Sequence, residues 1–243
     1  MKKLISMITV ALSLTLPLSA AAQDLTEDRV RELVLETIRE NPEIVMEAVA
    51  ILESRQAEAQ AASQAEVLAR ERDALERDPD APVLGNPDGD VTVVEFFDYN
   101  CPYCRRAKPE IEALLAADPN VRLVYREWPI LGEGSVFAAR AALAAREQDL
   151  HEDFHWAMMG MNGRAEESSV LQIAEDIGLD IAQLRRDMEA QEIDAHIQTS
   201  MRLAQALGIT GTPTFVIGDA LFPGVLDAEQ LRTLVSDARE PEQ

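Results

Sequence analysis

The spacing of apolar and polar positions predicts two consecutive helices near the N-terminus. From Glu27 to Glu40, apolar residues recur three and four positions apart and form one stripe, Val30, Leu33, Val34 and Ile38. Thr26 can cap this helix, and Asn41-Pro42 ends it. A second, longer helix is predicted from Glu43 to about Arg77, because Gly and Pro, the main helix breakers, are absent over that length.

The second helix changes character along its length. Its early part carries apolar residues at Ile44, Val45, Ala48, Val49, Ile51 and Leu52. Its later part, from about Gln56 to Arg77, consists mostly of Ala, Glu, Gln and Arg. A two-helix arm of roughly 50 residues cannot bury enough apolar surface to be stable alone. We therefore interpret residues 23–78 as an oligomerisation arm with the polar stretch as a spacer; a solvated helix that decorates the main domain is the alternative.

After Pro82 the pattern becomes that of an α/β domain, which we place at residues 79–243. Segments rich in β-branched and aromatic residues predict strands, and apolar spacings of three and four predict helices. The predicted elements are, in order, strand Val91–Phe97, helix Cys101 to about Ala117, strand Val121–Glu127, several helices between Ser135 and Leu207, a hairpin of Thr214–Ile217 and Ala220–Phe222, and a helix from Asp227 to about Ala238. These elements predict two β-α-β halves with a helical insertion, about residues 130–208, between them.

The first 22 residues have the three parts of a cleaved secretory signal peptide. Lys2 and Lys3 precede an apolar run from Leu4 to Leu18, and small residues follow. The run is shorter than the roughly 20 apolar residues that span a bilayer, which makes an uncleaved anchor the weaker alternative. Cleavage is predicted between Ala22 and Gln23, and the mature chain is expected in the periplasm.

The charge of the chain excludes nucleic acid as its main partner. Lys and Arg number 22 against 44 Asp and Glu, so the net charge is −22. Loss of Lys2 and Lys3 with the signal peptide takes the net charge of the mature chain to −24. Affinity for nucleic acid phosphates and for anionic membrane surfaces comes mainly from Lys and Arg, and the chain has too few of them.

Cys101 and Cys104 are the two cysteines of the chain, and only two residues separate them. A structural disulfide stabilises more as the loop it closes grows longer, so this pair is expected to be redox-active or metal-binding instead. The pair lies where a predicted strand ends and a helix begins. Free N–H groups at a helix N-terminus lower a thiol pKa from about 8.5 into the range of roughly 3.5–7.5. Cys101 is therefore predicted as the attacking sulfur, and Cys104 as the thiol that resolves the mixed disulfide.

The segment Val94–Cys104 resembles the active-site stretch of the DsbA-like branch of the thioredoxin superfamily. Pro109, eight residues after Cys101, matches the kinking proline of that family, and Gly211–Phe215 resembles its cis-proline loop. The block from Glu127 to Arg140 is also similar. The resemblance covers about residues 83–240 and implies an α/β, thioredoxin-like fold with a helical insertion, preceded here by the α-helical arm.

The resemblance also implies roles for individual residues. Glu95 matches the family's buried acid, which relays a proton to the resolving thiol Cys104. A cis peptide bond at Pro213 would present the backbone of Thr212 to an extended substrate segment. The substrate is expected to contact Thr212 and Pro213. It is also expected to contact Pro102 and Tyr103, the two residues between the cysteines.

A helical arm ahead of a CPYC domain resembles the exported ScsC proteins of suppressor-of-copper-sensitivity systems. The resemblance implies a homo-oligomer, with a trimer favoured over a dimer. The expected partners are cysteine-containing exported proteins and a membrane redox partner of unknown identity. No cofactor is expected, because the Cys101–Cys104 disulfide itself carries two electrons. Disulfide isomerase is favoured, since an oligomer brings several active sites around one misfolded chain; a dithiol oxidase and a periplasmic Cu(I) carrier are the alternatives.

Other chemistry-bearing residues are interpreted as structural. His151–His155 matches the zinc-binding pattern H-E-x-x-H, but the spacing to a third ligand is missing, so two surface histidines are expected. His196 is expected to be structural, and the Met158, Met159 and Met161 cluster is expected to be core rather than substrate groove. Two thiols without a third ligand make a weak Cu(I) site, so no metal site is predicted.

Overall fold

The computed structural model describes residues 26–240, and its contacts divide the chain into two units, residues 1–56 and 57–243. The predicted signal peptide, residues 1–22, lies outside the described residues. The N-terminal unit contains helix α1 (Glu27–Glu40) and the start of helix α2 (Glu43–Glu76), with the bounds expected from the sequence. The Thr26 side chain accepts a hydrogen bond from the backbone N–H of Arg29 at 3.3 Å and caps α1.

The apolar stripe of the N-terminal unit is open to solvent. No residue of α1 is buried, and apolar side chains of both helices are exposed: Val30, Leu33, Val34, Leu35, Ile44, Val45, Met46, Val49, Ile51 and Leu52. A contiguous apolar surface of this kind marks an interaction site more often than a free surface. Residues 26–56 therefore bury no apolar side chain of their own.

The later part of α2 belongs to the second unit, which corrects the predicted spacer. Leu68 and Leu75, seven positions apart on one face of α2, are each only 2% exposed. They pack in a cluster with Phe96, Val124 and other apolar side chains. The buried Arg126 donates hydrogen bonds to the carbonyl oxygen of Leu75 at 3.2 and 3.3 Å. The compact domain thus begins near Ala57 rather than at residue 79, because these contacts attach the helix to the sheet.

We expect Leu75→Ala to lower the free energy of unfolding of the domain by about 2–5 kcal/mol, because it leaves a cavity beneath the sheet. Urea unfolding of the fragment 57–243 measures this value. Leu131→Ala is the matched control, since Leu131 is 39% exposed, and its cost should stay below about 1 kcal/mol. Equal costs for the two variants would contradict the packing of α2 on the domain.

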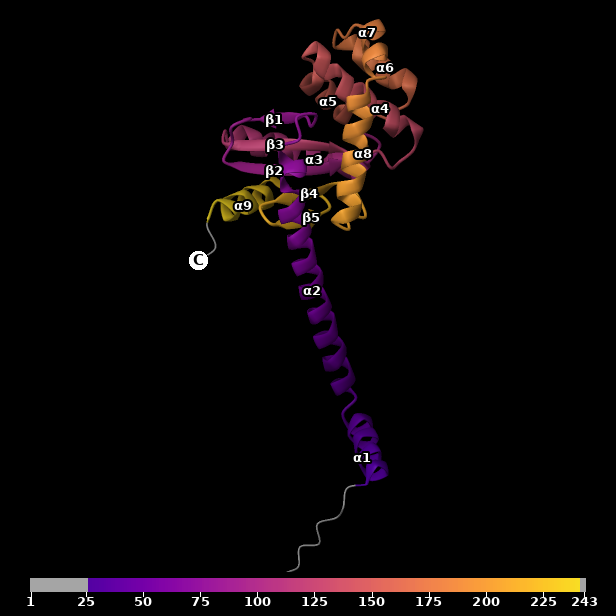
Figure 1. Ribbon diagram of the computed structural model, residues 1–243, viewed down its shortest axis with the longest axis vertical. Helices are drawn as coiled ribbons and strands as arrows, with labels where there is room; N and C mark the ends of the chain where they lie inside the picture. Colours follow the sequence, from indigo (N-terminus) through magenta and orange to yellow (C-terminus); the bar gives the residue numbers. More distant parts are fainter. Residues whose placement is uncertain (1–25, 241–243) are drawn as a thin grey trace, which may run out of the picture. The chain divides into compact units, whose positions relative to one another are not determined.

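The second unit is built on one five-stranded mixed sheet with the strand order β1-β3-β2-β4-β5 (Figure 1). The strands are β1 (Val83–Gly85), β2 (Val91–Phe97), β3 (Val121–Glu127), β4 (Thr214–Ile217) and β5 (Ala220–Pro223). β2 and β3 run parallel, and the other neighbouring pairs are antiparallel. The remaining elements are α3 (Pro102–Ala117), α4 (Glu133–Ala144), the short 3₁₀ helix η1 (Ala145–Gln148), α5 (His151–Gly160), α6 (Glu167–Asp176), α7 (Ile181–Asp187), α8 (Gln191–Ala206) and α9 (Ala228–Arg239).

Helices cover both faces of the sheet. α3 and α9 contact each other and cover one face. Their buried side chains pack in one cluster with the strand residues that point to this face, such as Val93 and Tyr125. α8 and the later part of α2 cover the alternate strand residues, such as Val94 and Phe96. α4 to α7 form the helical insertion. Because successive strand residues alternate in direction, Glu95 points to the α3 side.

Two features of the sheet differ from the predictions. Strand β1 was not expected, and it is only three residues long, which is too short to give a local pattern. The predicted second β-α-β half is wrong, because β4 and β5 form an antiparallel hairpin and α9 follows both. The predicted helices and the other strands are confirmed.

The predicted surface position of His151 and His155 is also wrong. His155 is 1% exposed and its Nδ1 lies 3.1 Å from the hydroxyl of Tyr99. His196 is buried too, and its Nε2 lies 2.6 Å from a carboxylate oxygen of Glu127. Burial alone would lower the pKa of His196, but the charge of Glu127 and hydrogen bonds to Asp78 and Glu127 raise it. His196 therefore has the structural role that the sequence predicts.

The methionine cluster is core, as predicted. Met158 and Met159 are buried in the main hydrophobic cluster, and Met161 packs against it. Thioether side chains fill irregular gaps of this kind well.

Candidate active site

Cys101 is the N-cap residue of α3, and Pro102 is the first residue of that helix. The pKa of Cys101 falls to about 5, and the largest cause is the hydrogen bond that the Cys104 thiol donates to its sulfur. Hydrogen bonds from Thr212 and from the backbone N–H groups of Tyr103 and Cys104 lower the pKa further, against the opposing effect of burial. The direction of this pKa shift agrees with the prediction, but its first cause is the Cys104 thiol rather than the helix N-terminus.

Cys104 lies one helical turn further on, and its environment has the opposite effect. It is 1% exposed, and burial is the largest cause that raises its pKa above the usual value, followed by the hydrogen bond to Cys101 and the charge of Glu95. Both cysteines are free thiols in the structure. At neutral pH the pair therefore combines an ionised outer sulfur with a protonated inner one, which is the division expected of an attacking and a resolving thiol.

Glu95 is a buried carboxyl group near both thiols. It lies in the middle of β2 and pairs in register with Tyr125 of β3 and Phe215 of β4. Within residues 26–240, neither of its carboxylate oxygens has a hydrogen-bond partner. Burial is the main cause that raises its pKa well above 4.5, and the charge of Cys101 adds to it. A carboxyl group with a raised pKa holds a proton more readily than a free one and can exchange it with a neighbouring thiol.

We expect Glu95→Gln to stabilise the reduced protein, and increasingly so as the pH rises. The folded pKa of Glu95 lies above the unfolded one, so between the two values the folded state binds more protons and stability falls with rising pH, by up to about 1.4 kcal/mol per pH unit. Glutamine removes this slope. Urea unfolding at acidic and mildly alkaline pH measures the difference, with the exposed Glu229→Gln as control. A difference that does not change with pH would contradict the burial of an ionisable group at this position.

The loop before β4 faces Cys101. The Thr212–Pro213 peptide bond is cis, as the resemblance implies. The sulfur of Cys101 lies 3.2 Å from the carbonyl oxygen of Thr212, to which the protonated thiol donates a hydrogen bond. The structure therefore brings the predicted residues of this loop next to the cysteines, while Pro102 and Tyr103 are exposed beside them. An extended substrate segment next to Cys101 could pair with the Thr212 backbone in the manner of an added strand.

Asp98 and Asn100, just before Cys101, are site residues that were not predicted. The carboxylate of Asp98 accepts hydrogen bonds from the backbone N–H groups of Asn100, Ile130 and Leu131 at 2.7–2.9 Å. The side-chain amide of Asn100 donates to the carbonyl oxygen of Ala165 at 3.1 Å and accepts from its N–H at 2.7 Å. These bonds fix the active-site loop to the helical insertion. Buried polar residues directly before the cysteine motif were the available signal.

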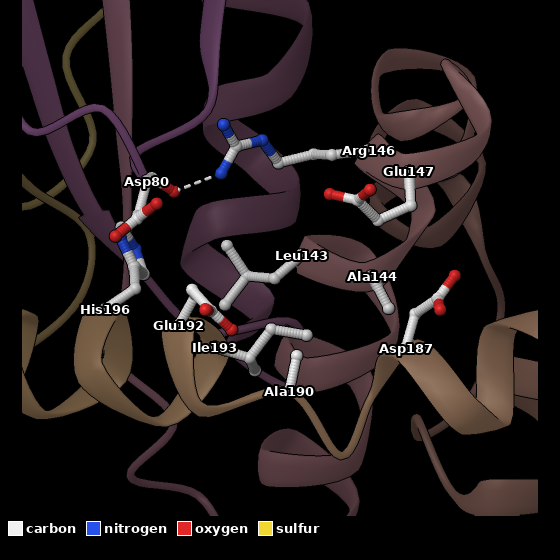
Figure 2. Close-up of a pocket in the computed structure, with 10 residues that line it drawn as sticks. All are labelled: Asp80, Leu143, Ala144, Arg146, Glu147, Asp187, Ala190, Glu192, Ile193 and His196. Carbon is white, nitrogen blue, oxygen red and sulfur yellow. Dashed lines mark hydrogen bonds between the residues drawn. The ribbon is translucent and has the colours of Figure 1, made fainter.

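A separate cavity of about 450 Å³ lies between η1, α7, α8 and the segment before β1 (Figure 2). Its lining residues are Asp80, Leu143, Ala144, Arg146, Glu147, Asp187, Ala190, Glu192, Ile193 and His196. None of the predicted site residues is among them. In the part of the chain that the structure describes, no cluster of three His, Cys, Asp or Glu side chains could hold a metal ion. This cavity is therefore not the site of the cysteine chemistry.

The fold and the cysteine site together are those of a DsbA-like thioredoxin domain. Residues 92–236 match the family model of the DSBA-like thioredoxin domain, and residues 27–59 match that of the copper resistance protein ScsC N-terminal domain. The chain belongs to the DSBA-like thioredoxin family.

Solved structures agree with this assignment. A thioredoxin-like oxidoreductase from Silicibacter pomeroyi DSS-3 is 67% identical, with 70% of this chain and 99% of that chain covered and a TM-score of 0.69. A linker-deletion mutant of Proteus mirabilis ScsC is 31% identical over 90% of this chain and 98% of its own, with a TM-score of 0.69. BcfH from Salmonella enterica Typhimurium is 28% identical over 88% of this chain and 96% of its own, with a TM-score of 0.74.

Curated relatives include longer proteins. The Na(+)/H(+) antiporter NhaA 1 of Salinispora arenicola is 31% identical over 164 residues, which are 66% of this chain and 25% of that protein. The chain thus spans about a quarter of the length of such relatives. Disulfide bond formation protein D of Bacillus subtilis is 25% identical over 173 residues, which are 63% of this chain and 75% of that protein. Among residues 26–240, no helix has the length and apolar content needed to cross a membrane.

Proposed function

We propose that this protein is an exported thiol-disulfide oxidoreductase that acts mainly as a protein disulfide isomerase on cysteine-containing exported proteins. The observation that carries the proposal is the pair of thiols at the start of α3. The pKa of Cys101 is lowered to about 5, and that of Cys104 is raised by burial. Thr212 and Pro213 lie opposite Cys101 to hold the substrate, and the disulfide itself is the only redox group required.

In isomerisation the thiolate of Cys101 attacks one sulfur of a substrate disulfide. A mixed disulfide forms, and the other substrate sulfur leaves as a thiolate. That thiolate attacks a different disulfide within the substrate, and a substrate thiolate finally attacks the mixed disulfide and releases Cys101 as thiolate. No electrons are gained or lost overall. The low pKa of Cys101 makes it both the ionised nucleophile and the better leaving group.

Cys104 provides the route out of a stalled mixed disulfide. Cys104 gives its proton to the carboxylate of Glu95 and attacks the sulfur of Cys101. The Cys101–Cys104 disulfide forms, and the substrate leaves with two reduced cysteines. We propose that a membrane redox partner then supplies two electrons and two protons to restore both thiols. The reverse sequence of steps oxidises a substrate dithiol.

We further propose that the N-terminal unit assembles the chain into a homo-oligomer, a trimer rather than a dimer, in the periplasm. Its exposed apolar stripe and its match to the ScsC N-terminal domain support assembly. A relative from Salmonella enterica serovar Typhimurium is described as a periplasmic thioredoxin-like protein, and it is 31% identical. The predicted signal peptide supports the same location.

The rate at which iodoacetamide alkylates the reduced protein tests the proposed nucleophile. The rate should follow a single ionisation with a midpoint near pH 5, because the pKa of Cys101 is about 5 while burial raises that of Cys104. Mass spectrometry should find the label on Cys101 and not on Cys104, whose pKa is raised. A midpoint above about 8, the value of an unperturbed thiol, would refute the proposed role of Cys101.

A further inference from the structure

Three arginines surround the cysteine motif. Arg105 and Arg106 follow Cys104 directly on α3, and Arg164 lies in the turn between α5 and α6. The guanidinium group of Arg106 lies over the exposed ring of Tyr103, 5.4 Å from its centroid. Tyr103 stands between the two cysteines, so Arg106 lies at the rim of the active site.

Arg105 connects the motif to the turn that carries Arg164. Its Nη1 donates a hydrogen bond to the carbonyl oxygen of Gly163 at 2.5 Å, and its Nε and Nη2 donate to the carbonyl oxygen of Tyr99 at 3.1 and 2.8 Å. The pKa of Arg105 is lowered by burial and then by the charge of Arg164, and the charges of Asp98 and both thiols raise it. Arg105 therefore interacts electrostatically with Arg164 and with both cysteine sulfurs.

The turn holds Arg164 in place beside this site. The side chain of Asn100 bonds both backbone groups of Ala165, the next residue along. Nη2 of Arg164 donates to the carbonyl oxygen of Leu131 at 2.9 Å. Ile130 and Leu131 are apolar and partly exposed, so Arg164 lies against an apolar strip at the edge of the active site.

These three positive charges lack a carboxylate partner within residues 26–240. Among the described residues, none of the three guanidinium groups forms an ion pair with a carboxylate. Two neighbouring carboxylates are engaged elsewhere. Asp98 accepts bonds from three backbone N–H groups, and Glu166 caps α6. Glu133, at the start of α4, is the remaining exposed carboxylate on the adjoining segment.

The chain as a whole is strongly negative, which makes a group of three arginines at the active site distinctive. The full chain has a net charge of −22, yet the rim of its reactive sulfur carries three unpaired arginines. A guanidinium group pairs with a carboxylate through two parallel hydrogen bonds and stays charged at every physiological pH. Complementary charges at a binding site chiefly raise the association rate and select among partners.

We infer that Arg105, Arg106 and Arg164 select substrate segments in which acidic residues flank the reactive cysteine. The inference rests on the proposed function, because it names the substrates of the same site. An acidic side chain on either side of the bound cysteine would meet an unpaired guanidinium group. Basic flanking residues would be repelled, and neutral ones would bind without this contribution.

The test uses three peptides that differ only in the residues flanking a disulfide-linked cysteine: Asp, Asn or Lys. We expect the exchange rate with the reduced protein to be about tenfold higher for the Asp peptide than for the Lys peptide at low salt. At about 1 M salt the screening length is only about 3 Å, and the preference should disappear. The Asn peptide serves as the neutral reference.

Arg164→Glu should lower the exchange rate of the Asp peptide relative to that of the Asn peptide several-fold. Arg186→Glu is the matched control, because Arg186 is exposed on α7, makes no ion pair among the described residues, and changes the net charge equally. The control should keep the ratio of the unmodified protein. Similar rates for all three peptides, or equal effects of the two variants, would overturn the inference and leave the proposed function standing. Failure of all three peptides to exchange would instead refute the proposed function, and with it this inference.

Discussion

Cys101→Ser is expected to lower the rate of disulfide exchange by on the order of 10³-fold or more, to the rate without protein. A serine hydroxyl is not ionised at neutral pH and forms no disulfide, so the first covalent step is lost. A self-quenched peptide disulfide, whose fluorescence rises when it is cleaved, measures the rate directly.

Cys104→Ser is the matched control for this prediction. It keeps the nucleophile and removes the resolving thiol, so it should react with the peptide and accumulate as a mixed disulfide, visible on a non-reducing gel. Cys101→Ser should form none. Exchange that persists in Cys101→Ser would mean that Cys104, despite its burial, carries the reaction.

Removal of residues 23–56 is expected to convert the oligomer into a monomer with a working active site. Each large apolar side chain that becomes fully buried between chains contributes about 1.5–3 kcal/mol, and the stripe of α1 and early α2 contains several. The deletion ends at residue 56 because Leu68 and Leu75 are needed for the core of the domain. Sedimentation equilibrium should give the mass of one chain for the fragment and a multiple of it for the mature protein.

Leu33→Ser with Val34→Ser in the mature chain should dissociate it without any deletion, since both side chains lie on the exposed stripe. The peptide exchange rate per active site should change less than about twofold in the fragment, because no residue of the site lies in the deleted part. An unchanged number of chains in the fragment would show that the assembly surface lies on the domain instead.

Local signals explain why so much of this fold could be predicted. Asn41-Pro42 ends the first helix of the arm, and the β-branched and aromatic residues of Val91–Phe97 identify a strand. The cysteine motif follows that strand at the start of a helix, and the structure gives Cys101 the low pKa that this position predicts. Each of these signals depends on neighbours within a few positions along the chain.

The features that were missed depend on contacts distant in sequence. Leu68 and Leu75 look like sparse apolar residues in a polar helix until the sheet packs against them. His155 could be recognised as buried only once Tyr99, 56 positions away, was placed beside it. The bond between Asn100 and Ala165 likewise joins residues 65 positions apart. Local periodicity contains no information on such pairs.

Reactivation of scrambled, fully oxidised ribonuclease tests the central claim most directly. The mature protein should restore ribonuclease activity, and the fragment 57–243 should restore far less while still oxidising reduced ribonuclease. That result would identify an isomerase whose arm brings several Cys101 thiolates to one misfolded chain. If neither form reactivates scrambled ribonuclease and both oxidise the reduced enzyme, the isomerase account is contradicted and the protein is a dithiol oxidase.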